Sequence, residues 1–444
     1  MSALQYGLTP KMKPIPPRRS AVVAALDVGS SKVACMIARL RPHGPQQVLT
    51  RRSHSVDVMG FGHTGARGIK AGSIINLAQA EEAIRHAVDA AERMASVEID
   101  SVVLSVSAGR LAGELFAANV DMVGSAVSEG DIARVLSAGS RHSLREGRAI
   151  LHSLPVDYSL DGTEGIRDPR GMLGGQFGVH MHIATTDVAV ARNLMLAVER
   201  CHLAVEAMVA SPYVAGLAVL ADDESDLGAA VVDMGSGTTT IAVFAGGRFV
   251  HLDGFALGGH HVTMDIARGL DVRTDDAERI KTLHGSVLTG GSDERDMIPL
   301  PPLSDEERDH ARFESRAGLV RIIKPRVEEI LEMVRDRLAA SVFGADPRGR
   351  VILTGGASQL SGLSDLAARI LDRPVRIGRP LGISGLPDAA KGAAFAVAAG
   401  LLVYPQAAHL EHFESRRKRN SSRYPMADSD GYFARVGRWL RESF

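Results

Sequence analysis

The sequence predicts an α/β fold with more than one layer, whose two halves share one local design. Strand and helix patterns alternate along most of the 444 residues, and 45 % hydrophobic against 23 % charged residues is an ordinary globular balance. One motif also occurs twice, at residues 24–37 and 230–244: an apolar strand, Asp, any residue, Gly, Ser, and a second apolar strand. A chain of this length can form two or three domains with ample cores.

Composition excludes several classes of protein. The net charge of −1 provides no bulk attraction to nucleic acid, so we expect no nucleic-acid partner. Cys35 and Cys201 are too few for a disulfide framework or a structural zinc site, which fits a reducing cytosol. Residues 1–20 are basic and proline-containing, and we expect a disordered tail there. No uninterrupted apolar run approaches the roughly 18 residues of a spanning helix.

The elements follow in order along the first half. Strands at 21–28 and 32–40 form a hairpin around the first motif, and helical spacing of apolar residues predicts a helix at 76–95. A strand-rich stretch, a helix with Ser128 as its N-cap and a strand at 150–160 resemble an insertion over roughly 97–177. The alternation then resumes, with strands at 179–187 and 205–210 and helices at 188–201 and 213–221.

The repeated bend has a chemical reading. Glycine lets the backbone turn so that successive N–H groups point at an anion, and small hydroxyl residues add donors, which favours phosphate. A carboxylate would repel phosphate, so Asp27 and Asp233 indicate a Mg²⁺ ion held through its water shell. One such bend is more often a plain hairpin turn, but two copies in separate halves of the chain favour the phosphate-binding interpretation.

A third glycine turn follows the strand pattern at 351–354. Gly355 and Gly356 allow a flat ring or a ribose to approach closely, and a helix opens at Ser358 or Ser361. Alone, such a turn is more often a simple strand-to-helix connection.

These motifs, in this order and with the helix at 274–285, resemble the actin-like ATPase superfamily. Within it the chain resembles the FtsA family of bacterial cell-division proteins, on residues 68–84, 150–174, 198–224, 258–285 and 375–386. The resemblance implies an actin-like, two-lobed ATPase fold with an inserted, small, β-rich α+β subdomain and a C-terminal amphipathic helix. The implied domains are a first lobe at 21–96 and 178–221, the inserted subdomain at 97–177, and a second lobe at 222–405 with its outer subdomain at about 261–345.

The resemblance also implies ATP and Mg²⁺ as cofactors and places the site residues. The phosphate hairpins hold Asp27, Gly29, Ser30, Ser31 and Lys32, and Asp233, Gly235, Ser236, Gly237, Thr238 and Thr239. Gly355 and Gly356 fall on the adenosine turn, and Glu278 and Lys281 on positions that hold ribose and base. On pattern alone, Glu278 and Lys281 are more simply a solvated i,i+3 ion pair. His260, His261 and His284 lack a third ligand at metal-site spacing, so we interpret them as ordinary polar residues.

Ser211 departs from the wider superfamily. It stands where chaperone relatives carry a glutamate, and actins carry a glutamine nearby. A serine positions water weakly and provides no carboxylate base. We therefore expect slow ATP hydrolysis at most, with Ser211 as a weak candidate at the water-positioning site; another side chain in that role is the alternative.

The chain end changes character. Residues 406–430 are polar and basic, which predicts a flexible linker. At 431–444, one helical arc carries apolar residues and the opposite side carries arginines, which suits a membrane interface. The apolar arc comprises Tyr432, Phe433, Val436, Trp439, Leu440 and Phe444, and the opposite side Arg435, Arg438 and Arg441. Docking on the protein's own core or on a partner is the alternative.

Together these features predict a cell-division protein on the cytoplasmic face of the cytoplasmic membrane at the division site. As the resemblance implies, it assembles with itself into filaments, tethers FtsZ to an anionic membrane surface and helps recruit later division proteins through its inserted subdomain. In the family the outer subdomain of the second lobe meets FtsZ. A pilus-assembly scaffold of the same fold is the runner-up, followed by a sugar kinase. A chaperone would need a peptide-binding domain for which few residues remain.

Overall fold

The computed structural model describes residues 9–43, 49–107, 110–140, 145–301, 312–345 and 348–413. The amphipathic helix predicted at 431–444 and the linker from residue 414 onward lie outside these residues. Within the described part, two sheets and two hydrophobic cores form, the first core including residues of both sheets, and this confirms the predicted two-lobed α/β fold.

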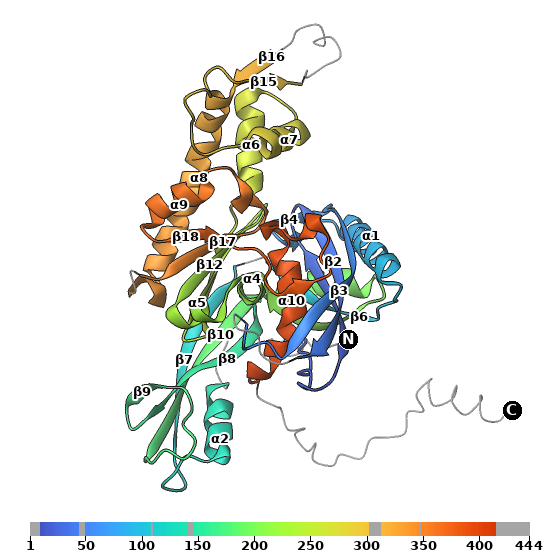
Figure 1. The fold of residues 1–444 in the computed structure, drawn as a ribbon. Helices are drawn as coiled ribbons and strands as arrows, with labels where there is room; N and C mark the ends of the chain where they lie inside the picture. The colour runs from blue at the N-terminus through green and yellow to red at the C-terminus, as the bar shows by residue number, and fades with distance from the viewer. Residues whose placement is uncertain are drawn as a thin grey trace, which may run out of the picture. The chain divides into compact units, whose positions relative to one another are not determined.

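The first lobe is built on a six-stranded sheet in the order β11-β6-β1-β2-β3-β19. Its consecutive buried residues along β1 and β2 are typical of strands covered on both faces. Helix α1 packs on β2 and β3, and α10 packs on β1, β2 and α4 (Figure 1). The elements are β1 (Ala21–Val28), β2 (Lys32–Pro42), β3 (His54–Gly65), β6 (Ser101–Val106), β11 (Ala204–Ala210), β19 (Ile383–Ser384), α1 (Leu77–Ala95), α3 (Val188–Glu199), α4 (Ser211–Val219) and α10 (Ala396–Ala407).

The second lobe repeats the strand pairing of the first. Strand β12 pairs antiparallel with β13 and parallel with β17, as β1 pairs antiparallel with β2 and parallel with β6. The sequence motif found twice is therefore also a structural repeat. Its strands are β12 (Ala229–Met234), β13 (Thr239–Ala245), β14 (Arg248–Phe255), β17 (Arg350–Thr354) and β18 (Val375–Ile377).

The outer part of the second lobe is helical. Helix α6 packs against both α7 and α8, and β15 pairs with β16 beside them (Figure 1). Helix α5 packs on β13, and α9 packs on α8 and β18. The elements are α5 (Asp222–Leu227), α6 (Gly259–Leu270), α7 (Thr274–His284), α8 (Arg316–Ala339), α9 (Leu363–Leu371), β15 (Met297–Leu300) and β16 (Arg312–Ser315).

Short elements connect these parts of the fold. They are β4 (Ile69–Lys70), β5 (Ser73–Ile74), and the 3₁₀ turns η2 (Val342–Ala345), η3 (Gly356–Gln359), η4 (Asp388–Ala390), η5 (Ala393–Phe395) and η6 (Ala408–Leu410).

The inserted subdomain differs from its predicted bounds of 97–177. Residues of β6 pair between β1 and β11 in the sheet of the first lobe, so the insertion begins after that strand. Its last strand, β10, runs to Asp187. A bridge between Asp253 and Ala112 joins its sheet to β14, giving one nine-stranded sheet. Its elements are β7 (Ala112–Asp121), α2 (Glu129–Gly139), β8 (Arg148–Leu160), β9 (Thr163–Ile166) and β10 (Gln176–Asp187).

Both predicted terminal boundaries were wrong in part. Thr9 is buried and its hydroxyl donates to the Ile150 carbonyl at 2.8 Å, so residues 9–20 are not all a free tail. Residues 406–412 are not linker either: α10 continues to Ala407, and the Glu411 side chain is buried against His152. Polar composition misled both predictions, because these residues find buried partners far away in the sequence.

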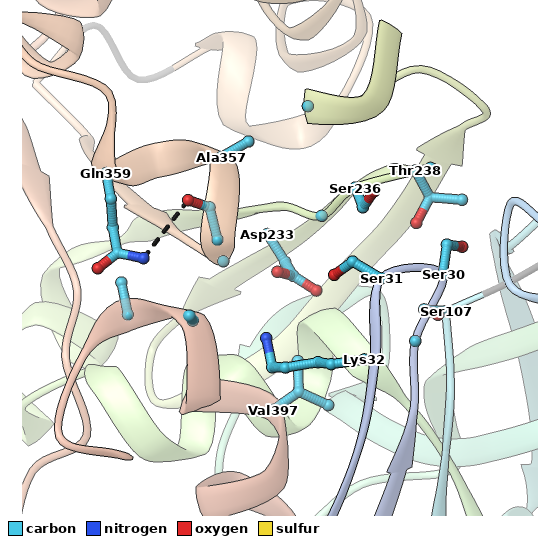
Figure 2. A pocket seen from close by; sticks show the side chains of 18 of the residues that line it. Ser30, Ser31, Lys32, Ser107, Asp233, Ser236, Thr238, Ala357, Gln359 and Val397 are labelled. Carbon is cyan, nitrogen blue, oxygen red and sulfur yellow. Dashed lines mark hydrogen bonds between the residues drawn. The ribbon is translucent and has the colours of Figure 1, made fainter. Parts of the chain in front are cut away.

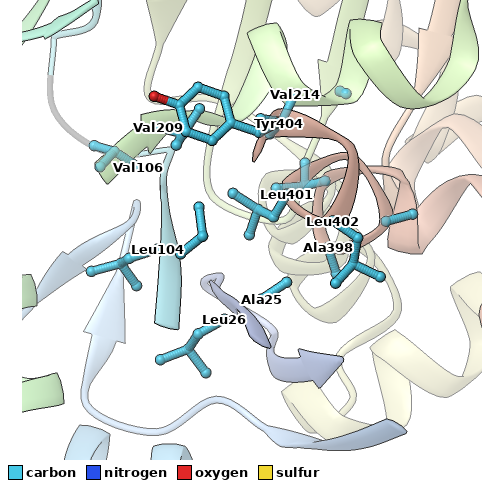
Figure 3. Packing of buried hydrophobic residues seen from close by; sticks show 14 of the residues in the cluster. Ala25, Leu26, Leu104, Val106, Val209, Val214, Ala398, Leu401, Leu402 and Tyr404 are labelled. Carbon is cyan, nitrogen blue, oxygen red and sulfur yellow. The ribbon is translucent and has the colours of Figure 1, made fainter. Parts of the chain in front are cut away.

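The first core positions the ends of β1 and α4. Residues of β1, β6, β11, α4 and α10 interdigitate there (Figure 3). Within the described residues, Ala393–Leu410 is long and apolar enough to cross a membrane, but 83 % of it is buried inside the protein. Its length comes from α10 and the two flanking 3₁₀ turns, and it is the central helix of this core.

Candidate functional site

A cleft of about 540 Å³ brings the predicted motifs together where the two lobes meet. Figure 2 shows Lys32 and Asp233 pointing into the same space, with Ser30 and Ser31 beside them. The predicted residues that line it are Asp27, Gly29, Ser30, Ser31, Lys32, Ser211, Asp233, Gly235, Ser236, Gly237, Thr238, Glu278, Lys281, Gly355 and Gly356.

The two glycine hairpins have the same backbone geometry. The Gly29 N–H donates to the Lys32 carbonyl at 3.0 Å, and the Gly235 N–H donates to the Thr238 carbonyl at 2.9 Å. A Cβ added at Gly29 would lie 3.0 Å from the Lys32 carbonyl oxygen, and a Cβ added at Gly235 would lie 3.0 Å from the Thr238 carbonyl oxygen. Each turn is therefore tight enough to favour glycine, and each presents small residues to the cleft.

The turn between β4 and β5 lies against both glycine hairpins. The Gly72 N–H donates to Ser30 Oγ at 2.8 Å, and a Cβ on Gly237 would lie 2.9 Å from the Ala71 Cα. Ala71 has a φ of 45°, a left-handed conformation that is uncommon for alanine. One short turn thus contacts a hairpin from each lobe.

The two aspartates form a buried pair of acids. Asp27 at the end of β1 accepts a hydrogen bond from Ser105 Oγ at 2.7 Å. Burial raises the pKa of Asp27, and burial together with the charge of Asp27 raises the pKa of Asp233 to about 7. Lys32 opposes both shifts. A buried pair of carboxylates, one of which raises the pKa of the other, fits a hard divalent cation such as Mg²⁺, which prefers oxygen ligands.

Asp233→Asn should stabilise the nucleotide-free protein at alkaline pH. The folded-state pKa lies above the ordinary value of 3.8, so the stability that protonated Asp233 provides below pH 4 is lost as the pH rises to about 7. Each pKa unit corresponds to about 1.4 kcal/mol, so we expect the amide variant to gain a few kcal/mol over wild type at pH 8 and almost nothing at pH 4. Melting temperatures across this range test it, with exposed Asp89→Asn as the control. A difference independent of pH would contradict it.

The glycine turn after β17 packs directly on Asp233. Gly355 has a φ of 84°, and a Cβ there would lie 2.5 Å from Asp233 Oδ1. Ser358 Oγ donates to the Gly355 carbonyl at 2.7 Å and closes a 3₁₀ turn, η3. The helix predicted from Ser358 or Ser361 begins instead at Leu363, because this turn and Gly362 intervene.

Glu278 and Lys281 form the predicted ion pair and also line the cleft. Their charged atoms are 2.7 Å apart, and Lys281 Nζ also donates to the Gly259 carbonyl at 3.1 Å and to Thr263 Oγ1 at 2.8 Å. The ion pair predicted from the sequence is therefore present, although Lys281 is largely buried, and the assignment to ribose and base stays a prediction. The pair is anchored on the first turn of α6, with Glu278 more exposed than Lys281.

Ser211 lies at the first turn of α4 and lines the same cleft. It is fully buried, and its Oγ is 3.5 Å from Thr240 Oγ1. This places a hydroxyl, without a carboxylate, at the position that the sequence assigned to water activation.

Thr239 is a predicted site residue that does not line the cleft. It is fully buried and its hydroxyl donates to the Leu257 carbonyl at 2.8 Å, because β13 begins there and turns the side chain inward. The sequence analysis missed other residues of the lining, among them Ser107, Gly259, Gln359, Ala393 and Val397. Gly259 could have been found, since it belongs to a glycine pair at the start of the helical pattern of α6.

The fold is that of the actin-like class. A solved structure titled "PilM-PilN type IV pilus biogenesis complex" matches with a TM-score of 0.57 and 16 % identity, over 86 % of this chain and 98 % of that one. The structure of MreB5 of Spiroplasma citri bound to ADP matches with a TM-score of 0.50 and 14 % identity, over 88 % and 98 %. At these identities the likeness concerns the fold alone.

Sequence comparison identifies the family. The family model for the cell division protein FtsA matches residues 230–400, and that for the SHS2 domain inserted in FtsA matches residues 108–185. The cell division protein FtsA of Agrobacterium fabrum is 52 % identical over 99 % of this chain and 98 % of its own. That of Escherichia coli is 31 % identical over 95 % and 98 %. The chain belongs to the FtsA family of cell division proteins.

Proposed function

We propose that this protein binds ATP with Mg²⁺, assembles into filaments, and attaches FtsZ polymers to the cytoplasmic face of the membrane at the division site. It then helps recruit later division proteins. Family membership supports the role in division. The amphipathic pattern of residues 431–444 supports attachment to the membrane, and the linker before it supports reach between the membrane and the folded part.

The observation that carries nucleotide binding is the pair of matching glycine hairpins around one cleft. Each closes with the same hydrogen bond and carries an aspartate at the end of its first strand. The MreB5 structure of the same fold contains ADP, which is consistent with this assignment. The family relationship favours division over the pilus-assembly alternative.

The residues of the cleft have distinct proposed roles. Backbone N–H groups and hydroxyls of the hairpins bind the phosphates, and Lys32 adds a positive charge. Mg²⁺ would be held by Asp27 and Asp233 through water and would neutralise phosphate charge. The turn at Gly355 and Gly356 accommodates adenosine, with Glu278 and Lys281 at the edge of the cleft for ribose and base.

Binding and assembly can be tested on purified protein. A fluorescent ATP analogue should bind in Mg²⁺ and more weakly in a chelator, and sedimentation should show polymers with ATP that are fewer without it. Absence of ATP binding would overturn the assignment of the cleft. Binding without any polymer would limit the proposal to a nucleotide-dependent adaptor.

Ser211→Glu should raise ATP turnover without tightening ATP binding. A carboxylate at this position can accept a proton from the attacking water, whereas the serine hydroxyl cannot at neutral pH. Phosphate release and analogue titration measure the two effects, with Ser211→Gln as the uncharged control. A wild-type rate near that of a metabolic enzyme, on the order of 10 per second, would show that Ser211 does not limit turnover and would favour the kinase alternative.

A further inference from the structure

A buried polar cluster joins the C-terminal end of the folded part to the strand that leads into Ser211. His152 on β8 is fully buried, and its Nδ1 lies 2.7 Å from Glu411 Oε1. Its other nitrogen, Nε2, accepts the Ala210 N–H at 2.9 Å. Ala210 is the last residue of β11 and immediately precedes Ser211.

These contacts fix the protonation of the ring. Because Nε2 accepts from a backbone N–H, the proton is on Nδ1, which donates to Glu411. Burial lowers the pKa of His152, which keeps the ring neutral and Nε2 an acceptor. The ring also packs edge-on against Tyr213 in the first turn of α4, with centroids 4.9 Å apart.

The Glu411 side chain also contacts two residues other than His152. The Tyr404 hydroxyl donates to Glu411 Oε1 at 2.9 Å, and Lys11 Nζ lies 3.9 Å from Oε2. The next residue, His412, donates its N–H to the Ser153 carbonyl at 2.8 Å. The chain is thus bonded to β8 through both Glu411 and His412, one residue before the described part ends at Phe413.

We infer that His152 is a positioning residue that couples the departure point of the C-terminal segment to the Ser211 end of the cleft. A displacement of Glu411 removes the acceptor that orients the ring, and the ring then no longer fixes the Ala210 N–H. Since a buried N–H without a partner costs free energy, the backbone before Ser211 must rearrange. By linkage, nucleotide at that end of the cleft alters the hold on Glu411 in return. The nucleotide part of this inference rests on the function proposed above.

Hydrogen exchange of the full-length protein tests the contact without nucleotide. In Glu411→Ala, the peptide covering residues 205–213 should exchange roughly five- to tenfold faster than in wild type, as expected for loss of one hydrogen bond. Glu411→Gln keeps an acceptor for Nδ1–H and should restore slow exchange. His409→Ala is the matched control on the same segment, because that ring bonds to the Gln406 carbonyl.

The ratio of the dissociation constants for ATP and ADP provides a second measurement. This ratio would not change if His152 and Glu411 only stabilised the fold. Glu411→Ala should alter the ratio of the two dissociation constants several-fold, while Glu411→Gln and His409→Ala retain the wild-type ratio. Unchanged exchange at 205–213, or an equal increase in the β2 peptide covering 33–40, would overturn the inference. If Glu411→Ala does not fold, the same measurements are made on His152→Phe, which keeps an aromatic ring but has no acceptor nitrogen. Failure of wild type to bind ATP would overturn the proposed cleft function, and the exchange result would still decide the role of His152.

Discussion

Asp27→Ala and Asp233→Ala should each remove most of the gain that Mg²⁺ gives to ATP binding. Both carboxylates end a first strand beside the same cleft, and the charge of one raises the pKa of the other. A charge-assisted contact contributes roughly 1.5 to 3 kcal/mol, so Mg²⁺-dependent affinity should fall roughly ten- to a hundredfold. Affinity in a chelator should change far less. Titration of a fluorescent ATP analogue with and without Mg²⁺ measures both.

Asp89→Ala provides the control for loss of one acidic charge, because this residue is exposed on α1. Unchanged Mg²⁺-dependent affinity in both cleft variants would remove the metal assignment while leaving the phosphate hairpins in place. If only Asp233→Ala lowered the Mg²⁺-dependent affinity, the cation would be held by the second lobe alone.

Trp439→Glu should release the protein from anionic liposomes and leave ATP binding intact. Burying an apolar side chain gains roughly 1.5 to 3 kcal/mol, and glutamate would lose this and add repulsion. Sedimentation with liposomes measures the effect. Gly431→Glu adds the same charge on the arginine side of the helical arc and should bind nearly as wild type. Wild-type sedimentation of Trp439→Glu would instead favour docking of this segment on protein.

A single copy of the predicted helix at residues 431–444 should bind weakly. Ordering the helix costs roughly 1 to 2 kcal/mol per residue in backbone entropy, which offsets much of the gain from its few apolar residues. Several copies on one filament bind as a multivalent array, so assembly would control attachment. Raising the salt concentration should weaken binding further, because the arginines act through a screened potential.

Local chemistry made the hairpins predictable. Asp27 with Gly29, and Asp233 with Gly235, stand at bends where only a small residue fits. This steric requirement involves only residues that are neighbours in the sequence, so the sequence reveals it. Spacing likewise predicted β1, β2, α1, α3, β11 and α4 of the first lobe, whereas β3, β19 and α10 were not predicted.

Long-range contacts explain what the sequence did not predict. The place of β6 depends on pairing with β11, about a hundred residues later in the chain, so a strand-rich stretch alone could not reveal which sheet it joins. Glu411 lies in a polar stretch that resembles linker, and its burial depends on His152 and Lys11. Thr239 has the right residue type for phosphate, but the start of β13 turns its hydroxyl away.

Co-sedimentation of FtsZ with anionic liposomes tests the central claim most directly. With ATP, wild-type protein should carry FtsZ polymers into the liposome pellet, and a variant that ends at residue 430 should bind FtsZ but leave it in the supernatant. Equal amounts of FtsZ in the liposome pellet with wild type and with the shortened variant would contradict the account.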